Sequence, residues 1–387
     1  MILQAIQSKN FDEAKQQLQA GEKLDPSVNI YTKSQIFDTL LKEKQFDILQ
    51  HLIKDKTITL DIYELDSFNN TIFDRILYSL NTDEDSLAFL EDFLLKVDNL
   101  NDEVTGKTLL SYFFEKEAPL AFIVKLIDAG ADISYKNNAE EGYLHQIAKT
   151  YTRNTELLTN YIEFLVEQGL DVNAGNIVGQ TPLHQAIDLN RKEFIAPLLK
   201  AGADPNQLDK GRKSSFFLAV AHKLDSELYQ LLKDYGSPDF DELTKDGASL
   251  FFEYLRISYD NSERGLQLLT QLLKDGADLY QVNSYHGREA TPIDLLAEKK
   301  SEILQTVLNH GNFDINRQDD EGNTLLHKVC AYNVNYEAEK AKETYRKVKL
   351  LLENGADKDI TNNKDQTALA LASDDNLKIK TVELLMK

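Results

Sequence analysis

Three histidines occupy matching places in similar segments of the sequence, and a periodic histidine could coordinate a metal ion. They are His145, His184 and His327. A protein zinc site brings about four ligands together on one ion. Each of these histidines stands alone in its own segment, far from the other two along the chain. The sequence therefore predicts neither a metal site nor a bound cofactor.

A single cysteine is the next candidate for chemistry. Cys330 is the only cysteine in the chain, so the sequence forms no internal disulfide and no cysteine metal cluster. It follows Leu326 and His327 at helical spacing, in an inward position where alanine also fits. No neighbouring residue would activate it as a nucleophile, so we expect a packed thiol.

Paired acidic residues recur, and two carboxylates could perform acid–base hydrolysis. A glycosidase-type site needs two acids at a fixed separation in one cleft. Here the pairs fall at the same place in different segments, just before the start of an expected helix. They fit two interpretations, solvated turn residues or an acidic binding strip. The pairs are Asp102-Glu103, Glu140-Glu141, Asp241-Glu242 and Asp319-Asp320-Glu321.

Known catalytic motifs are absent from the sequence. It contains no P-loop, glycine-rich dinucleotide loop, His-Glu-x-x-His or Gly-x-Ser-x-Gly motif. We therefore predict no enzymatic activity and no small-molecule substrate.

The charge balance restricts the class of partner. The 387 residues carry a formal net charge of -21, which repels nucleic-acid phosphates and anionic membrane surfaces. The charge favours a basic protein partner, or it serves only to keep the protein soluble. The first fifteen residues lack the apolar core of a signal peptide. No apolar run approaches the ~20 residues of a membrane span, so we expect a cytoplasmic protein.

An internal repeat determines how these residues are positioned. Residues 179–186 read Gly-Gln-Thr-Pro-Leu-His-Gln-Ala, and residues 201–206 read Ala-Gly-Ala-Asp-Pro-Asn. Weaker copies extend in both directions. Aligned on the apolar residue at the place of Leu183, successive copies lie 33 to 43 residues apart and predict eleven helix pairs. The aligned residues are Leu3, Phe37, Phe73, Leu110, Leu144, Leu183, Phe216, Phe251, Ile293, Leu326 and Leu369.

The repeated residues have physical roles that fit a helix pair followed by a turn. Thr181 should cap the first helix, and Pro182 suits its first position, where a missing N–H costs nothing. Gly202 should end the second helix in a left-handed conformation. Asp204 and Asn206 suit the turn that follows.

This pattern resembles the ankyrin repeat, whose fingerprint is G-x-T-P-L-H-x-A followed by a helix and G-A-D-x-N. The resemblance implies an all-α solenoid of stacked helix pairs with short hairpin-like fingers, in which the motif histidine bonds between adjacent fingers. The alternative is a tetratricopeptide-type solenoid with a period of about 34 residues. It is disfavoured because Thr-Pro-Leu-His and Gly-Ala-Asp have no role there.

The match varies along the chain and suggests three parts of one continuous solenoid. Residues 1–104 follow the spacing but lack Gly-Ala-Asp, so we expect irregular ankyrin-like units there. Residues 105–365 are the ankyrin repeats, and residues 366–387 are a capping unit.

Ankyrin proteins usually bind through finger tips and the inner helix surface, so the tips provide the candidate contacts. Several tips carry apolar, aromatic or arginine residues, which are typical of interfaces. The rival site is an edge rich in tyrosine, where longer turns join the two helices of a pair: Tyr151, Tyr161, Tyr254, Tyr259, Tyr332, Tyr336 and Tyr345. The predicted contacts are Asn176, Ile177, Val178, Gln180, Leu208, Arg212, Asp241, Glu242, Tyr280, Tyr285, His286, Arg288, Asp319, Asp320 and Glu321.

The sequence thus predicts a protein-binding module, monomeric by itself. One hypothesis is an inhibitor or immunity protein that neutralises a basic effector or toxin. A scaffold or a host-directed effector fits the same residues. An enzyme with ankyrin targeting repeats would need roughly 100 residues free of repeats, and the alignment leaves no such region.

Overall fold

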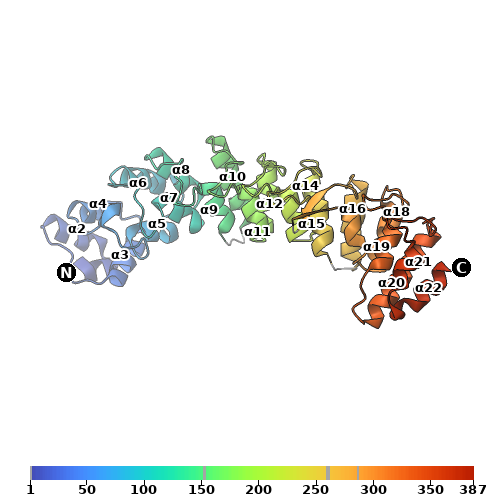
Figure 1. Ribbon diagram of the computed structural model, residues 1–387. Coiled ribbons are helices and arrows are strands. Elements are labelled where there is room, and N and C mark those ends of the chain that lie inside the picture. Colours follow the sequence, from blue (N-terminus) through green and yellow to red (C-terminus); the bar gives the residue numbers. More distant parts are fainter. Residues whose placement is uncertain (1, 151–153, 259–261, 286) are drawn as a thin grey trace. The chain divides into compact units, whose positions relative to one another are not determined.

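A computed structural model describes residues 2–150, 154–258, 262–285 and 287–387. Its contacts divide the chain into two compact units, Met1–Ile177 with Thr181–Gly202, and Val178–Gln180 with Ala203–Lys387. Both are built from short helices joined by tight turns and longer fingers (Figure 1).

The first unit contains six helix pairs within the described residues. One short 3-10 helix, η1 (Ile62–Glu64), lies in the finger before the third pair. The pairs are α1 (Ile2–Gln7) with α2 (Phe11–Gln19), α3 (Ile30–Lys42) with α4 (Phe46–Lys54), α5 (Ile72–Ser79) with α6 (Glu84–Leu94), α7 (Leu109–Glu115) with α8 (Leu120–Asp128), α9 (Tyr143–Lys149) with α10 (Thr155–Glu167), and α11 (Pro182–Asp188) with α12 (Lys192–Lys200).

The second unit contains five more pairs among the described residues. Its first pair joins α13 (Ser215–Phe217), which runs on into a π-helical turn, η2 (Leu218–His222), with α14 (Ser226–Lys233). Then come α15 (Leu250–Ile257) with α16 (Glu263–Lys274), α17 (Pro292–Leu296) with α18 (Ser301–His310), α19 (Leu325–Ala331) with α20 (Ala338–Glu353), and α21 (Ala368–Ala372) with η3 (Asn376–Lys378) and α22 (Ile379–Leu385). One finger forms a hairpin of β1 (Asn283–Tyr285) and β2 (Arg288–Ala290).

Within the second unit, the first helix of each pair packs on the first helix of the next pair, and the second helices pack on one another in the same way. Thus α15 packs on α17, α17 on α19 and α19 on α21, while α14, α16, α18, α20 and α22 form a parallel row. Each residue used to align the repeats lies in the first helix of its pair. Nine of them, from Phe37 to Leu326, are buried, whereas Leu3 and Leu369, in the first and last pairs, are half-buried. The eleven-pair prediction and the all-α fold class are confirmed.

The clearest repeat has the predicted local structure. Thr181 Oγ1 accepts the N–H of His184 at 3.3 Å, and His184 Nδ1 accepts the N–H of Thr181 at 3.2 Å, so the two residues cap the helix reciprocally. Gly202 has φ +97° just after α12. The N–H of Asn206 donates to Asp204 Oδ1 at 2.8 Å and closes the expected turn.

The N-terminal pairs depart from this pattern, as expected from their missing Gly-Ala-Asp. Lys56, at φ +63°, takes the left-handed position after α4 that glycine takes after α12. A side chain in this conformation costs roughly 1–2 kcal/mol. The following finger is also irregular, with η1 and a parallel bridge between Asp61 and Asp98. The boundaries proposed for the three parts of the chain stay a prediction.

The histidine and cysteine that looked chemical have structural roles in the second unit. His327 Nε2 lies 3.1 Å from the carbonyl oxygen of Gln366, so it bonds to the next finger as the resemblance implied. Cys330 is fully buried, and burial raises the pKa of its thiol to about 12. The packed-thiol interpretation is therefore confirmed.

The finger that contains the β1–β2 hairpin is longer than the finger that follows it. The segment between α16 and α17 spans residues 275–291, and the next one, between α18 and α19, spans residues 311–324. The first is therefore three residues longer and contains the β1–β2 hairpin. The finger therefore accounts for part of the long spacing from Phe251 to Ile293.

Candidate functional site

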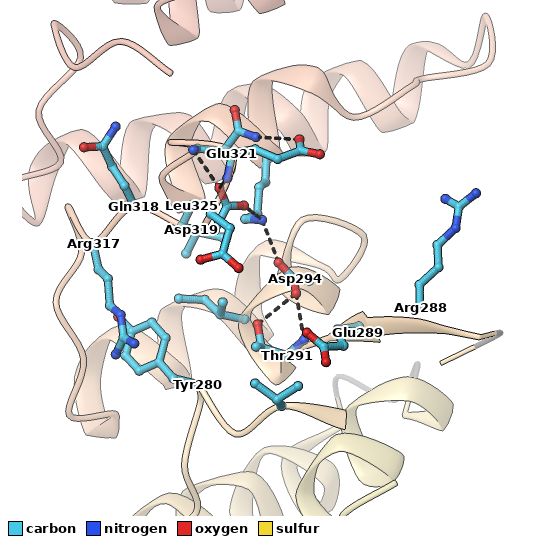
Figure 2. A pocket seen from close by; sticks show the side chains of 16 residues that line it. Tyr280, Arg288, Glu289, Thr291, Asp294, Arg317, Gln318, Asp319, Glu321 and Leu325 are labelled. Atoms are coloured by element: carbon cyan, nitrogen blue, oxygen red, sulfur yellow. Dashed lines mark hydrogen bonds and ion pairs between the residues drawn. The ribbon is translucent and has the colours of Figure 1, made fainter. Parts of the chain in front are cut away.

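A groove of about 800 Å³ lies in the second unit, between the long finger with the β1–β2 hairpin and the shorter finger at residues 317–323 (Figure 2). It is partly open to solvent. Five of the contacts predicted from the sequence line it: Tyr280, Arg288, Asp319, Asp320 and Glu321. The groove is thus the place where the fold brings the largest group of them together.

One lysine, Lys328, forms ion pairs with two elements that line the groove, α17 and the finger at residues 317–323. Lys328 Nζ lies 2.7 Å from Asp294 Oδ1 and also pairs with Asp319. Asp294 Oδ2 accepts the N–H and hydroxyl of Thr291 at 2.7 and 2.8 Å, which caps α17. Burial opposes charge on both partners. Even so, the contacts with Lys328 and Thr291 hold the pKa of Asp294 below its ordinary value, and the two carboxylates raise the pKa of Lys328.

Asp319 builds the finger tip, which corrects its predicted role as a free contact. Its Oδ1 accepts the backbone N–H groups of Glu321 and Asn323 at 3.0 and 2.8 Å, and its other oxygen pairs with Lys328. A carboxylate with these internal partners fixes the loop and is poorly placed to meet an incoming cation.

An aromatic–cation stack forms one end of the groove. The guanidinium of Arg317 lies 3.9 Å from the ring centroid of Tyr280, and the Tyr280 hydroxyl donates to the carbonyl of Asp314 at 2.9 Å. Figure 2 shows this stack on the side opposite Arg288, which extends from β2. The stack fixes the Tyr280 ring as a flat wall.

The remaining charges of the groove are predominantly acidic. Glu289, Asp320 and Glu321 are exposed, and none has a cationic partner among the described residues. Arg288 is exposed beside Glu289. The groove lining carries five carboxylates against three cations, Arg288, Arg317 and Lys328, so its net charge is negative.

The other predicted contacts lie outside the groove. Ile177 and Val178 are 48% and 50% exposed, and Asp241 is exposed. Gln180 and Leu208 are half-buried. The contact role of these residues stays a prediction.

Three of the predicted contacts need correction or cannot be placed. Asn176 is only 6% exposed, so its side chain supports the finger and offers little surface to a partner. The side chain of Tyr285 and all of His286 lie outside the described residues.

Arg212 and Glu242 form a pair across two neighbouring fingers. The guanidinium of Arg212 binds the carboxylate of Glu242 and also donates from Nε to the carbonyl of Leu243 at 3.0 Å. These two predicted contacts therefore satisfy each other in the free protein, and a partner would have to replace this bond.

One member of an acidic pair, Glu141, is not a surface residue, whereas Glu140 beside it is exposed. Glu141 is 5% exposed and binds Lys149 at 2.5 Å and the amide of Gln185 at 2.6 Å. Burial opposes its charge, but these contacts hold the pKa of Glu141 below its ordinary value. For this residue both interpretations drawn from the sequence, a solvated turn or a binding strip, were wrong.

Two of the five described tyrosines of the tyrosine-rich edge belong to the core. Tyr161 is buried with its hydroxyl donating to the carbonyl of Ala118, and Tyr254 is buried with its hydroxyl donating to Gly265 at 2.9 Å. Tyr332 and Tyr345 are half-buried, and Tyr336 is 95% exposed. Tyr151 and Tyr259 lie outside the described residues.

Sequence reasoning missed the residues that organise the groove, Asp294, Arg317 and Lys328. A signal existed for one pair. Asp294 stands at the histidine place of its motif, and Lys328 follows the histidine of the next motif, so opposite charges lie one repeat apart. No comparable signal pointed to Arg317.

Comparisons with known proteins give a consistent picture. A family model described as "Ankyrin repeats (3 copies)" matches residues 115–209. The chain is 30% identical over 175 residues to the nuclear factor NF-kappa-B p105 subunit of Gallus gallus, covering 44% of this chain and 17% of that protein. It is 28% identical over 203 residues to the B-cell lymphoma 3 protein homolog of Mus musculus, covering 52% and 42%. The chain therefore spans less than half the length of either relative.

Among solved structures, the ankyrin repeat domain of Bcl-3 matches with a TM-score of 0.50 and 23% identity, covering 63% of this chain and 97% of that one. This likeness concerns the fold. Within the described residues, no helix is both long and apolar enough to cross a membrane.

Proposed function

This chain is an ankyrin-repeat protein, and from that premise we propose that it is a non-enzymatic protein-binding module whose groove at residues 280–328 receives a basic segment of its partner. The observation that carries the proposal is the groove itself, in which four available contacts predicted from sequence, Tyr280, Arg288, Asp320 and Glu321, line a surface with unpaired carboxylates.

The groove combines the two properties that binding needs. Its acidic rim, within a chain of net charge -21, would attract a positively charged partner and speed association. Its walls contain Tyr280 and the apolar Val282, the latter 53% exposed. Aromatic and aliphatic surfaces of this kind hold a complex together once it has formed.

The biological role that best fits these properties is neutralisation of a basic effector or toxin, as an inhibitor or immunity protein does. In that role the protein would be cytoplasmic and monomeric until it meets its target. A large negative charge suits it, because fast association matters when a toxin must be captured before it acts.

The test begins with identification of the partner by affinity capture and mass spectrometry, followed by binding kinetics with the purified partner. Asp320→Ser with Glu321→Ser should reduce the association rate about three- to tenfold at low salt and flatten its salt dependence. The control is Glu227→Ser with Asp234→Ser, which removes the same charge from an exposed position of α14 and from the exposed residue that follows its C-terminus. Equal kinetics for both double variants would contradict binding at the groove.

A further inference from the structure

We propose that the partner segment binds in an extended conformation, as a third strand hydrogen-bonded to the outer edge of β2. This inference rests on the proposed function and specifies its geometry. The occupant is a basic peptide segment in which lysine or arginine alternates with β-branched apolar residues.

The register of the hairpin identifies the free edge. Tyr285 pairs with Arg288, and Ser284 and Glu289 form the next pair. In an antiparallel ladder, hydrogen-bonded pairs alternate with non-hydrogen-bonded pairs. Ser284 and Glu289 form a non-hydrogen-bonded pair, so the backbone N–H and C=O groups of each residue point away from the other strand. The N–H of Ser284 donates to the carbonyl of Gly247 at 2.8 Å, which confirms the outward direction on the β1 side. On the β2 side, the N–H and C=O of Glu289 face the groove.

Backbone hydrogen bonds join the neighbouring fingers elsewhere in this unit. No such bond between described residues joins the hairpin to residues 317–323. The N–H donors, with their carbonyl acceptors, are Lys210 to Val178 (2.9 Å), Lys245 to Gly211 (2.9 Å), Ser284 to Gly247 (2.8 Å) and Asn363 to Glu321 (3.0 Å). The groove therefore occupies the position where a backbone contact between fingers would otherwise lie.

The difference in finger length explains this opening. The hairpin finger is three residues longer than the one after it, so the shorter loop does not supply a strand alongside β2. An edge with unpaired N–H and C=O groups accepts strands from other chains. A volume of about 800 Å³ lies within the range of pockets that enclose ligands.

Charge and polarity define the occupant. In a strand, successive side chains alternate between the two faces. One face of an inserted strand would meet the apolar side chain of Val282, which is 53% exposed, and the other would meet Glu289 and Asp320 on the rim. A second copy of this chain is disfavoured, because two chains of charge -21 repel each other.

The probe for the test is an eight-residue peptide of alternating valine and lysine, with two analogues. Each analogue carries N-methyl groups on one alternate set of backbone nitrogens. Only one set can face Glu289, so we expect one analogue to bind about tenfold more weakly than the parent peptide and the other to bind comparably. Fluorescence anisotropy with the full chain measures all three affinities.

A matched pair of variants tests the same bond from the protein side. Glu289→Ala removes the carboxylate, whereas Glu289→Pro removes both the carboxylate and the outward N–H. Proline is tolerated at an edge-strand position whose N–H lies outside the ladder. We expect the proline variant to bind the peptide several-fold more weakly than the alanine variant, at equal thermal midpoints.

Amide hydrogen exchange gives a readout that needs no variant. In the wild-type chain the peptide should slow exchange of the Glu289 amide about tenfold. It should leave Ala290, whose amide already faces β1, nearly unchanged.

The failures of the two proposals are distinguishable. If Asp320→Ser with Glu321→Ser weakens peptide binding while both methylated analogues bind like the parent and Glu289 gains no protection, strand addition is wrong and the proposed function stands. If the peptide does not bind, or binds independently of the acidic residues, both proposals are wrong.

Discussion

Replacing Lys328 with methionine should destabilise the second unit by about 2 kcal/mol. The change keeps most of the side-chain length and removes the cation that Asp294 and Asp319 share. Asp294 would retain its bonds to Thr291 but lose its only charged partner among the described residues.

The magnitude follows from burial. Exposed ion pairs contribute about 0.2–1 kcal/mol, whereas removing one partner of a fully buried pair costs about 3–5 kcal/mol. The side chain of Lys328 is 21% exposed and those of both aspartates are 33% exposed, so the cost lies between these ranges. In a double-mutant cycle with Asp294→Asn, which preserves an acceptor for Thr291, the coupling energy should be about 1 kcal/mol.

The effect should also depend on pH in a defined way. Because the pKa of Asp294 is lowered, its ionised carboxylate contributes to folding stability above pH 3.8, the ordinary pKa. This contribution is lost as the pH falls through the lowered pKa. The raised pKa of Lys328 makes its contribution present below 10.5 and lost at higher pH. The difference between wild type and variant should therefore be constant from about pH 5 to 10 and shrink below about pH 4.

Urea unfolding followed by circular dichroism and tyrosine fluorescence measures these differences, since the chain has no tryptophan. Lys349→Met is the control, because Lys349 is 56% exposed and pairs loosely with Glu353 at 3.8 Å. It should cost less than about 0.5 kcal/mol. Equal destabilisation by both variants, or a cycle without coupling, would refute the structural role assigned to Lys328.

Three further predictions test the fold. Thr181→Ala should cost about 1 kcal/mol through loss of the cap, and Gly202→Val should cost more because Gly202 has φ +97°; unchanged thermal midpoints for both would mean that the repeat register is wrong. Tyr161→Phe should lower stability by about 1 kcal/mol, because it leaves the Ala118 carbonyl without its hydroxyl donor. It should not alter partner binding; a binding defect in a folded variant would restore the tyrosine edge as a site. Native Cys330 should not react with a disulfide reagent at pH 8 until urea unfolds the chain, since burial raises its thiol pKa to about 12; rapid reaction in the native state would contradict its burial.

Residues that act through local backbone geometry could be predicted from the sequence. Thr181 caps a helix and Gly202 ends one through bonds that span only a few positions, so their spacing carries the information. The alignment also placed its eleven residues correctly in the first helix of each pair, because each repeat packs in the same way against the next.

Residues that act across repeats were harder to predict. Glu141 reads as an exposed tip acid, yet Gln185 and Lys149 bury and neutralise it from other segments. Arg317 stacks on Tyr280 from a different finger, and neither residue indicates the other in the sequence. Which tip residues remain available to a partner depends on such pairings, so the sequence located the fingers better than it identified the contacts.

The insertion before α17 shows how a repeat fold can gain a binding site at little cost to its stability. Stability in a repeat array is approximately a sum over neighbouring repeats, and lengthening a surface loop adds only a small entropic cost. Ile293 and the helices around it keep the ordinary packing between repeats, so the three extra residues change the finger alone.

A longer hairpin beside an unchanged neighbour necessarily exposes backbone groups on its outer edge. Exposed edges invite aggregation unless charge or a partner covers them. Arg288 and Glu289 supply charge at this edge, and the pairing of Lys328 with Asp294 and Asp319 leaves the rim acidic. Edge protection and selection for a basic strand therefore depend on the same residues.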